Sequence, residues 1–390
     1  MTSHSAPLSL YLHIPFCRTK CTYCAFNTYT NLDDLIEPFV QALIHEIAIV
    51  ASRGVSLQLG TIYLGGGTPS LLTPHQIERI LAAVHRGFAV LPAAEISLEA
   101  NPNDLHRAYL TDLRRLGINR LSIGMQSAHA NELSLFARRH DNDMVARAVS
   151  SARHAGLDNL NLDLIYGFPH QTLESWRASL RQLVALQPEH VSLYALGLED
   201  GTPMADWVAR GRLPLPDDDL AADMYDLATD LLDGYGYQQY EISNWSKLGY
   251  SSRHNLQYWR NLPYLGLGPG AHGFAGGIRY STVLRPQHYI QLLDTAGSLY
   301  DFPCTPATAE SVVVDRVGEI AETLMMGLRL TQEGIQRRVF AERFGLDLLE
   351  SHGSIIEKYR DYGLLHVDGD LVRLTARGRF LSNTIFRELV

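Results

Sequence analysis

The chain has few cysteines, no surplus of basic residues and no long apolar run, and each shortage excludes a class of protein. Four cysteines in 390 residues are too few for a disulfide framework, which favours a reducing compartment. A net charge of −9 offers no general attraction to nucleic acid. No segment approaches the roughly 20 apolar residues that span a bilayer, and the first residues lack the pattern of an export signal. We therefore expect a cytoplasmic globular protein that does not bind nucleic acid.

Residues 8–240 alternate β-rich runs with longer segments of helical apolar spacing. Several runs are apolar at most positions, as expected of parallel strands that are covered on both faces. Six such βα units fall short of the eight that close a barrel. The predicted fold is therefore α/β, a curved and partly open (β/α)6 barrel with functional residues at the carboxyl ends of its strands. The six runs are 8–14, 60–64, 95–99, 120–124, 159–165 and 190–195.

Two further regions follow the predicted barrel, which is assigned residues 1–240. Residues 241–305 form an extension rich in aromatic side chains and glycine. We expect packed irregular structure over 235–300 and a linker at 296–306. Residues 315–390 combine helical spacing with a hairpin pattern at 365–372, which predicts a small, mostly helical, winged-helix-like unit. This unit has eleven basic and twelve acidic residues, so it is expected to cover the barrel or dock a partner rather than to bind DNA.

Three cysteines lie on one loop directly after the first predicted strand. Thiolates from Cys17, Cys21 and Cys24 can converge there on one metal centre. Zinc would need a fourth ligand such as His13, whereas a [4Fe–4S] cluster would take three thiolates and leave one iron open. The soft ligands favour the cluster, and on chemistry alone zinc stays an alternative.

The run YLHIPFCRTKCTYC, from Tyr11 to Cys24, resembles the signature of radical S-adenosylmethionine proteins. Tyr23 stands directly before the third cysteine, as in that family. The resemblance implies a [4Fe–4S] cluster whose open iron is chelated by S-adenosylmethionine. It also implies that the cofactor carries out the radical chemistry while the protein orients it and excludes solvent.

The resemblance implies further roles for residues at other predicted strand ends. Asp163 would accept hydrogen bonds from the ribose, and Arg138 would face a carboxylate. Tyr11 and Gln126 would pack beside the cofactor. The glycines after the second strand have no Cβ atoms and would let backbone groups approach the methionine ammonium. The implied cofactor-binding residues of the barrel are Tyr11, Tyr23, Phe26, Gly66, Gly67, Thr68, Glu99, Gln126, Arg138 and Asp163.

Over its whole length the chain resembles the branch that contains the oxygen-independent coproporphyrinogen III oxidases and the HemW-type heme chaperones. The oxidases typically have a fourth cysteine two residues after the third and an extension before the cysteine loop. Here Phe26 stands in that position, and the loop starts at residue 17. The chaperones have phenylalanine there and an HNxxYW motif, which this chain matches from His254 to Trp259. The resemblance therefore implies heme delivery to apo-hemoproteins, with His254 as a heme ligand.

Several alternatives stay open at this stage. One is an oxidase that decarboxylates propionates, and another is a radical methyltransferase or cyclopropanase of the same branch. From the residues alone, His254 can instead cap a turn while Tyr258 and Trp259 pack in a core. Neither a catalytic residue nor a role for Cys304 is assigned, and the oligomeric state is open. Respiratory enzymes are candidate recipients of the heme, which would allow peripheral membrane contact.

Overall fold

Parallel strands form the larger part of the computed structural model, which describes residues 7–53, 57–295 and 300–389. Six strands pair in chain order, each parallel to the next, which confirms the predicted βα units. Alternate residues of each strand face the inside of the barrel, while the others face the helices. These strands are β1 (Leu8–Ile14), β2 (Gln58–Gly66), β3 (Ala89–Ala100), β4 (Arg120–Gln126), β5 (Leu160–Tyr166) and β6 (His190–Ala195).

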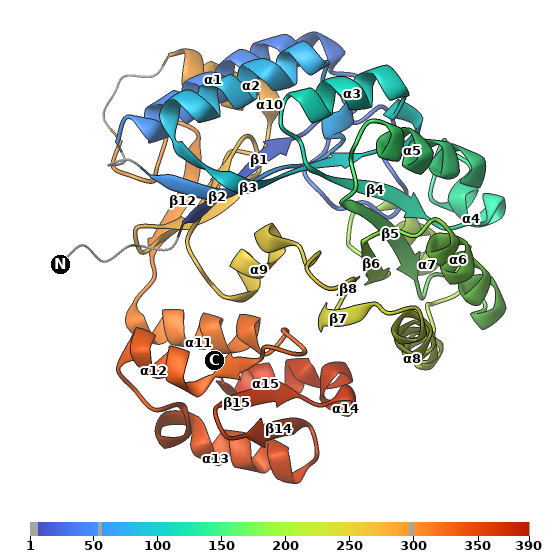
Figure 1. The fold of residues 1–390 in the computed structure, drawn as a ribbon, viewed down its shortest axis with the longest axis vertical. Coiled ribbons are helices and arrows are strands. Elements are labelled where there is room, and N and C mark those ends of the chain that lie inside the picture. The colour runs from blue at the N-terminus through green and yellow to red at the C-terminus, as the bar shows by residue number, and fades with distance from the viewer. Residues whose placement is uncertain (1–6, 54–56, 296–299, 390) are drawn as a thin grey trace.

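Helices cover the outer face of this curved sheet (Figure 1). In α2 the buried residues Ile77, Ile80, Leu81 and Val84 recur at helical spacing, and a capping box between Thr73 and Gln76 begins the helix. The large apolar core lies between the strands and these helices. The helices are α1 (Ile36–Ala51), α2 (Pro74–Gly87), α3 (Arg107–Arg115), α4 (Ala130–Leu135), α5 (Asn142–His154), α6 (Leu173–Ala185), α7 (Pro203–Ala209) and α8 (Asp218–Gly234).

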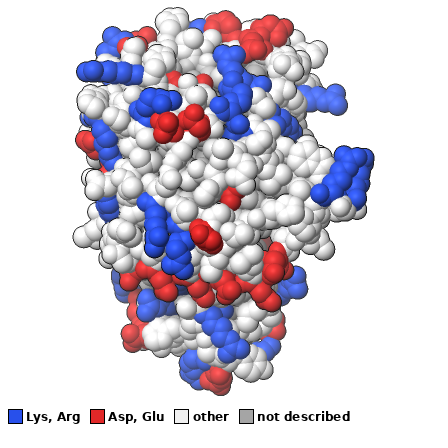
Figure 2. Space-filling model, turned by 90° about the vertical axis from the view of Figure 1, so that its right-hand side faces the viewer, with Lys and Arg blue, Asp and Glu red and all other residues white. Residues whose placement is uncertain are grey.

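The exposed face of α8 is acidic. Figure 2, which views this side of the molecule, shows a band of acidic side chains across the level at which α8 lies. The aspartates of this helix leave its apolar residues, among them Met224 and Leu232, on the buried side. The exposed aspartates are Asp217, Asp218, Asp219, Asp223, Asp226, Asp230 and Asp233. This face therefore repels polyanions.

The expectation of irregular structure over 235–300 is wrong, because this part of the chain extends the sheet at both edges. On one side β9 pairs parallel to β1, and β10, β11 and β12 follow; on the other side β8 and β7 continue from β6. Glycine misled the prediction: a Cβ on Gly266 would stand 1.8 Å from the carbonyl oxygen of His272, so β9 needs glycine to approach that backbone. Of the predicted linker, 296–299 lie outside the described residues. The elements are β7 (Gln238–Glu241), β8 (Asn244–Ser246), α9 (Arg253–Trp259), β9 (Tyr264–Leu267), β10 (His272–Ala275), β11 (Ile278–Thr282), α10 (Pro286–Asp294) and β12 (Thr308–Val313).

Helix α9 lies on the inner side of the sheet, opposite the outer helices (Figure 1). Its first turn contacts Thr61, in the amino-terminal half of β2, and Glu95, near the middle of β3. The far end of the barrel, where the strands reach their carboxyl ends, is open. Helix α9 therefore closes one end of the barrel interior, and the cysteine loop stands at the other.

The C-terminal unit has a core of its own beside the barrel (Figure 1). Its three-stranded antiparallel sheet contains the hairpin expected at 365–372, packed against helices, which agrees with the predicted mostly helical unit. Its elements are α11 (Arg316–Gly327), β13 (Ile335–Gln336), α12 (Arg337–Phe344), α13 (Leu348–Asp361), β14 (Leu365–Asp368), β15 (Leu371–Leu374), α14 (Ala376–Phe380) and α15 (Ser382–Leu389). Throughout the described ranges, every helix is too short or too polar to cross a membrane.

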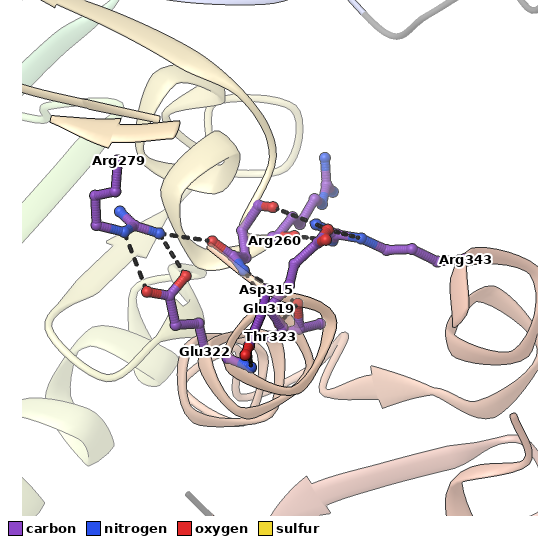
Figure 3. A network of polar contacts seen from close by, with 9 residues as sticks. Arg260, Arg279, Asp315, Glu319, Glu322, Thr323 and Arg343 are labelled. Atoms are coloured by element: carbon purple, nitrogen blue, oxygen red, sulfur yellow. Dashed lines mark hydrogen bonds and ion pairs between the residues drawn. The ribbon is translucent and has the colours of Figure 1, made fainter. Parts of the chain in front are cut away.

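A polar network joins this unit to the segment that follows α9 (Figure 3). Arg343 of α12 donates to the backbone oxygen of Asn261 at 2.7 Å and forms an ion pair with Glu319 of α11. The amide of Asn261 in turn donates to Thr323 at 3.1 Å. The C-terminal unit is therefore fastened to the chain directly after α9.

Candidate cofactor site

A cavity of about 680 Å³ lies at the carboxyl ends of the barrel strands. The three cysteines and nine of the eleven predicted cofactor-binding residues line it. These nine are Tyr23, Phe26, Gly66, Gly67, Thr68, Glu99, Gln126, Arg138 and Asp163. The structure thus brings together residues of four strands, the cysteine loop and the segment after α4, which lie up to 146 positions apart in the sequence. Tyr11 and His254 lie elsewhere.

The cysteine loop is held at the cavity by backbone and side-chain contacts. The amide of Cys17 donates to the carbonyl oxygen of Tyr29 at 2.8 Å, and Thr68 donates to the Cys17 sulfur at 3.4 Å. The guanidinium of Arg138 lies 3.6 Å from the sulfur of Cys21. Gly67 allows the loop and β2 to approach, because a Cβ there would stand 2.7 Å from two backbone oxygens. Burial raises the pKa of the Cys17 and Cys24 thiols.

These thiols fit a cluster better than a single ion. Within residues 7–53, 57–295 and 300–389, no three side chains of Cys, His, Asp or Glu converge as one metal ion requires. A four-iron cluster is larger and accepts thiolates that stand further apart. His13 is not available as the fourth zinc ligand, because its ring nitrogens contact the oxygen of Asn27 at 2.9 Å and the hydroxyl of Tyr11 at 3.0 Å. The donor set therefore fits a [4Fe–4S] cluster with one open iron.

Glu99 and Asp163 are two of the carboxylates that line the cavity. Glu99 accepts hydrogen bonds from the Tyr63 hydroxyl at 2.8 Å and from the amide of Gly66 at 2.9 Å. Burial raises the pKa of Glu99 to about 7, which the hydrogen bonds from Tyr63 and Gly66 oppose. Asp163 accepts from Asn161 at 2.6 Å, and burial raises its pKa as well. Both groups suit a ligand that brings positive charge or hydroxyl donors to the cavity, since either would satisfy a buried carboxylate.

Arg138 and Gln126 complete the wall of the cavity. The guanidinium of Arg138 donates to Asn101 at 2.7 Å and to the backbone oxygen of Gly124 at 2.9 Å. The pairing of β4 with β5 shifts between Gly124 and Gln126, and Gln126 has a φ of 65°. Such a bulge redirects the side chain at the end of a strand. Gln126 therefore faces the cavity, as predicted.

Tyr11 does not reach the cavity, which corrects the expectation that it packs beside the cofactor. Its ring stacks on Tyr63 with centroids 6.2 Å apart, and its hydroxyl contacts His13. Strand β1 places it opposite Tyr63, further from the strand ends than the glycines of β2. Tyr11 therefore supports a residue of the cavity wall from below.

His254 also lies outside the cavity, buried beneath it. Its Nδ1 contacts the Thr61 hydroxyl at 2.6 Å, and its Nε2 contacts the Tyr258 hydroxyl at 2.8 Å. Both ring nitrogens therefore have partners inside the protein, and the assignment of His254 as a heme ligand stays a prediction. Burial, together with the positive charge of Arg120, lowers the pKa of His254 to about 3, so the ring is neutral.

Sequence reasoning missed several residues of the cavity wall. Tyr63, Asn101, Ser122 and Tyr194 all line it. Tyr63, Asn101 and Tyr194 stand at or near the carboxyl end of a predicted strand. Ser122 faces the same side of β4 as Gly124. Applying the strand-end argument to every inward-facing position, rather than only to those with a known motif, would have found them.

Comparisons with known proteins agree with this site. Residues 11–183 match the family described as the radical SAM superfamily, and residues 318–381 match the HemN C-terminal domain. A protein of Bacillus subtilis named heme chaperone HemW is 35% identical over 381 residues, which cover 97% of this chain and 98% of the relative. The Escherichia coli protein of the same name is 39% identical over 73% of this chain and 76% of its own. The solved structure of coproporphyrinogen III oxidase (HemN) from Escherichia coli, described as a radical SAM enzyme, has a TM-score of 0.83 at 24% identity, over 99% of this chain and 90% of that one.

The parallel barrel, the three-cysteine loop and the cavity beside it define a radical S-adenosylmethionine protein, whose cofactors are a [4Fe–4S] cluster and S-adenosylmethionine. Within that superfamily, the similarity over nearly the full length of its relatives shows that the chain belongs to the HemW family. The oxidase structure supports the fold, including the helical C-terminal unit.

Proposed function

We propose that this protein is a heme chaperone, which binds heme and transfers it to apo-hemoproteins. The observation that carries the proposal is the end-to-end similarity to relatives named heme chaperone HemW. It includes the barrel, the segment with α9 and the C-terminal unit. A similarity confined to the barrel would support a radical S-adenosylmethionine protein of any kind, whereas a similarity over every part supports this more specific function.

In this proposal, each cavity residue binds a different part of the cofactors. The three cysteines hold the cluster. Glu99 takes the methionine ammonium, Asp163 the ribose hydroxyls and Arg138 a carboxylate, since each partner satisfies the charge or hydrogen-bonding need of that side chain. When bound, the cluster and S-adenosylmethionine supply one-electron chemistry at the sulfonium. We propose that their binding prepares the protein for heme transfer rather than serving a decarboxylation.

Phe26 is the residue that we propose to contact heme. It lines the cavity beside the cysteine loop, and its side chain is 69% exposed. An exposed ring next to a cavity is a suitable surface for the apolar face of a macrocycle. The oxidases of this branch typically have cysteine at this position, so an exposed phenylalanine favours binding over that enzyme's chemistry.

The recipients and the location remain part of the proposal. Respiratory hemoproteins are candidate recipients, the cytoplasm is the proposed location, and contact with a membrane surface would follow from recipients that reside there. An anionic lipid surface would be repelled by the aspartates of α8 (Figure 2). We therefore propose that any membrane contact uses another face. Cell fractionation with and without a membrane-bound recipient tests this.

An anaerobic heme titration followed by absorbance tests the function. The reconstituted protein is expected to bind heme saturably and then to lose it to apo-myoglobin. Phe26→Ala is expected to weaken heme binding about tenfold, since it removes a large apolar contact. Leu248→Ala, a change of an exposed apolar residue on a loop away from the cavity, is the matched control.

Two results would overturn the proposal. The first is heme binding that never saturates in protein with a full cluster. The second is saturable binding without any transfer to the apo-protein. Formation of decarboxylated product from coproporphyrinogen III in the same preparation would instead indicate the oxidase.

A further inference from the structure

We propose that α9, the helix of the HNxxYW motif, positions the wall of the cofactor cavity through a single ring contact between His254 and Tyr63. His254 is in this view a positioning residue for S-adenosylmethionine binding and not a ligand of heme iron. The inference uses only the cofactor cavity, so it stands or falls separately from heme transfer.

The path from α9 to the cavity has two contacts. The His254 ring stacks on the Tyr63 ring, with centroids 5.0 Å apart and planes inclined by 24°. The Tyr63 hydroxyl donates to Glu99 at 2.8 Å, and both Tyr63 and Glu99 line the cavity. A displacement of the imidazole therefore changes the position of the hydroxyl that orients Glu99.

Helix α9 is itself fixed to the strand that carries Glu99. The amides of Arg253 and His254, in its first turn, donate to Glu95 of β3 at 3.0 and 3.1 Å. Glu95 and Glu99 stand four residues apart on β3, so both face the barrel interior. Strand β3 thus binds α9 through Glu95 and lines the cavity with Glu99.

The hydrogen-bond network assigns the tautomer of His254. The Thr61 hydroxyl donates to Ser9 at 2.7 Å, so its oxygen is left to accept a hydrogen bond from Nδ1–H of His254. Nε2 then accepts the hydroxyl hydrogen of Tyr258. The lone pair that would bind iron is the one that Tyr258 occupies. The same contacts hold the imidazole plane against Tyr63.

Several buried groups surround His254 and act on its charge. Arg120 of β4 brings a positive charge, and Tyr11 of β1 lies with its ring centroid 6.5 Å away. Glu95, below the ring, is engaged by the amides of α9. A neutral ring in this setting stacks and hydrogen bonds without adding a second positive charge near Arg120.

Variants of His254 and Tyr63 separate positioning from ligation. In cluster-reconstituted full-length protein, His254→Ala is expected to weaken S-adenosylmethionine binding about fivefold, measured by calorimetry, and to alter the change that S-adenosylmethionine makes in the electron paramagnetic resonance spectrum of the reduced cluster. Tyr63→Phe, which keeps the ring but loses the hydroxyl, is expected to give a similar loss. His85→Ala, an exposed histidine of α2, is the control.

Two further variants test whether His254 acts on the cavity through Tyr63. The double variant His254→Ala with Tyr63→Phe is expected to bind no more weakly than either single variant, because both break the same path. His254→Phe keeps a ring against Tyr63 and cannot ligate iron, so it is expected to recover most of the affinity. His254→Leu, which keeps apolar volume but loses the ring contact with Tyr63, serves as the test if His254→Ala fails to fold.

The outcomes that would overturn the inference are distinct. Unchanged S-adenosylmethionine affinity in His254→Ala and Tyr63→Phe alike would show that α9 does not act on the cavity. Additive losses in the double variant would show that His254 does not act through Tyr63. Loss of heme binding in His254→Phe, with S-adenosylmethionine affinity intact, would restore the ligand assignment and leave the chaperone function standing.

Discussion

The two ends of the barrel are built from the same strands but carry different kinds of polar site. Strand β3 shows the contrast within four residues. Glu95, at the end closed by α9, accepts hydrogen bonds from two amides of that helix. Glu99, at the open end, accepts from Tyr63 and Gly66 and still borders a cavity of about 680 Å³.

The difference teaches that a buried carboxylate is a ligand site only where its covering leaves space. At the closed end the helix supplies donors from its own backbone, so Glu95 stabilises the fold. At the open end the protein supplies fewer donors than the two oxygens can accept, and a ligand can provide the rest. The raised pKa of Glu99 is the electrostatic sign of that incomplete compensation.

The largest expected effect sharpens the contrast at the open end. Cys21→Ser should abolish the brown absorbance of the reconstituted cluster and reduce bound iron to near zero, since a serine hydroxyl is a poor ligand for the cluster. The free energy of unfolding of the cluster-free protein should change by only about 0.5 kcal/mol, because the substitution does not affect the end of the barrel closed by α9. Cys304→Ser is the control and should retain the cluster. Stoichiometric zinc without iron in the unaltered protein would contradict the cluster assignment.

The closed end should dominate stability. Glu95→Ala leaves two amides of α9 buried without an acceptor, so we expect a loss of about 3 kcal/mol in urea unfolding of the cluster-free protein. Glu99→Ala should cost about 1 kcal/mol, because water in the cavity can replace the carboxylate. Equal losses in the two variants would break the comparison between the ends.

The open end should respond to pH. Burial raises the pKa of Glu99 from its ordinary value of 4.5 to about 7, so between these values the folded protein retains a proton that the unfolded chain has released. Stability of the cluster-free protein should therefore fall by about 2 kcal/mol as pH rises from about 5 to 7.5. Glu99→Gln should flatten this part of the profile. An unaltered slope in that variant would assign the dependence to another buried group, such as Glu241, whose pKa is also raised to about 7.

The smallest effect concerns the link between α9 and the C-terminal unit. Arg343→Ala removes the donor to the backbone after α9 and the partner of Glu319, so we expect a loss of about 1 kcal/mol and faster proteolysis between the two units (Figure 3). Arg338→Ala, on the same helix in an exposed ion pair with Glu342, should change neither quantity. Identical behaviour of the two variants would mean that the network carries no part of the attachment.

The barrel strands could be predicted from the local sequence because each is an apolar run followed by a segment with helical spacing. Two of them, Leu8–Ile14 and His190–Ala195, have the predicted bounds. The strands between residues 241 and 313 escaped prediction because their partners are distant: Leu267 pairs with Leu12. Four-residue strands that contain glycine look like turns until that partner is known.

In the site, too, some residues could be predicted from the sequence, whereas the location of His254 could not. The cysteine loop was predicted from its place directly after the first parallel strand, a position that topology fixes. Glu99, Arg138 and Asp163 were predicted from the resemblance to a family, and all three line the cavity. The location of His254 could not be predicted, because the sequence of its motif does not show which end of the barrel it covers. Only the contacts with Thr61 and Glu95 reveal that.

The parallel pairing of β9 with β1 has a consequence for synthesis of the chain. A nascent chain that has emerged only to residue 240 still lacks the strand that covers the edge of β1 and the helix that fills the barrel interior. Its first strand is then an open edge, able to pair with other chains. The barrel can be completed only after residue 267 has left the ribosome, so cluster insertion should follow that moment rather than accompany the cysteine loop as it emerges.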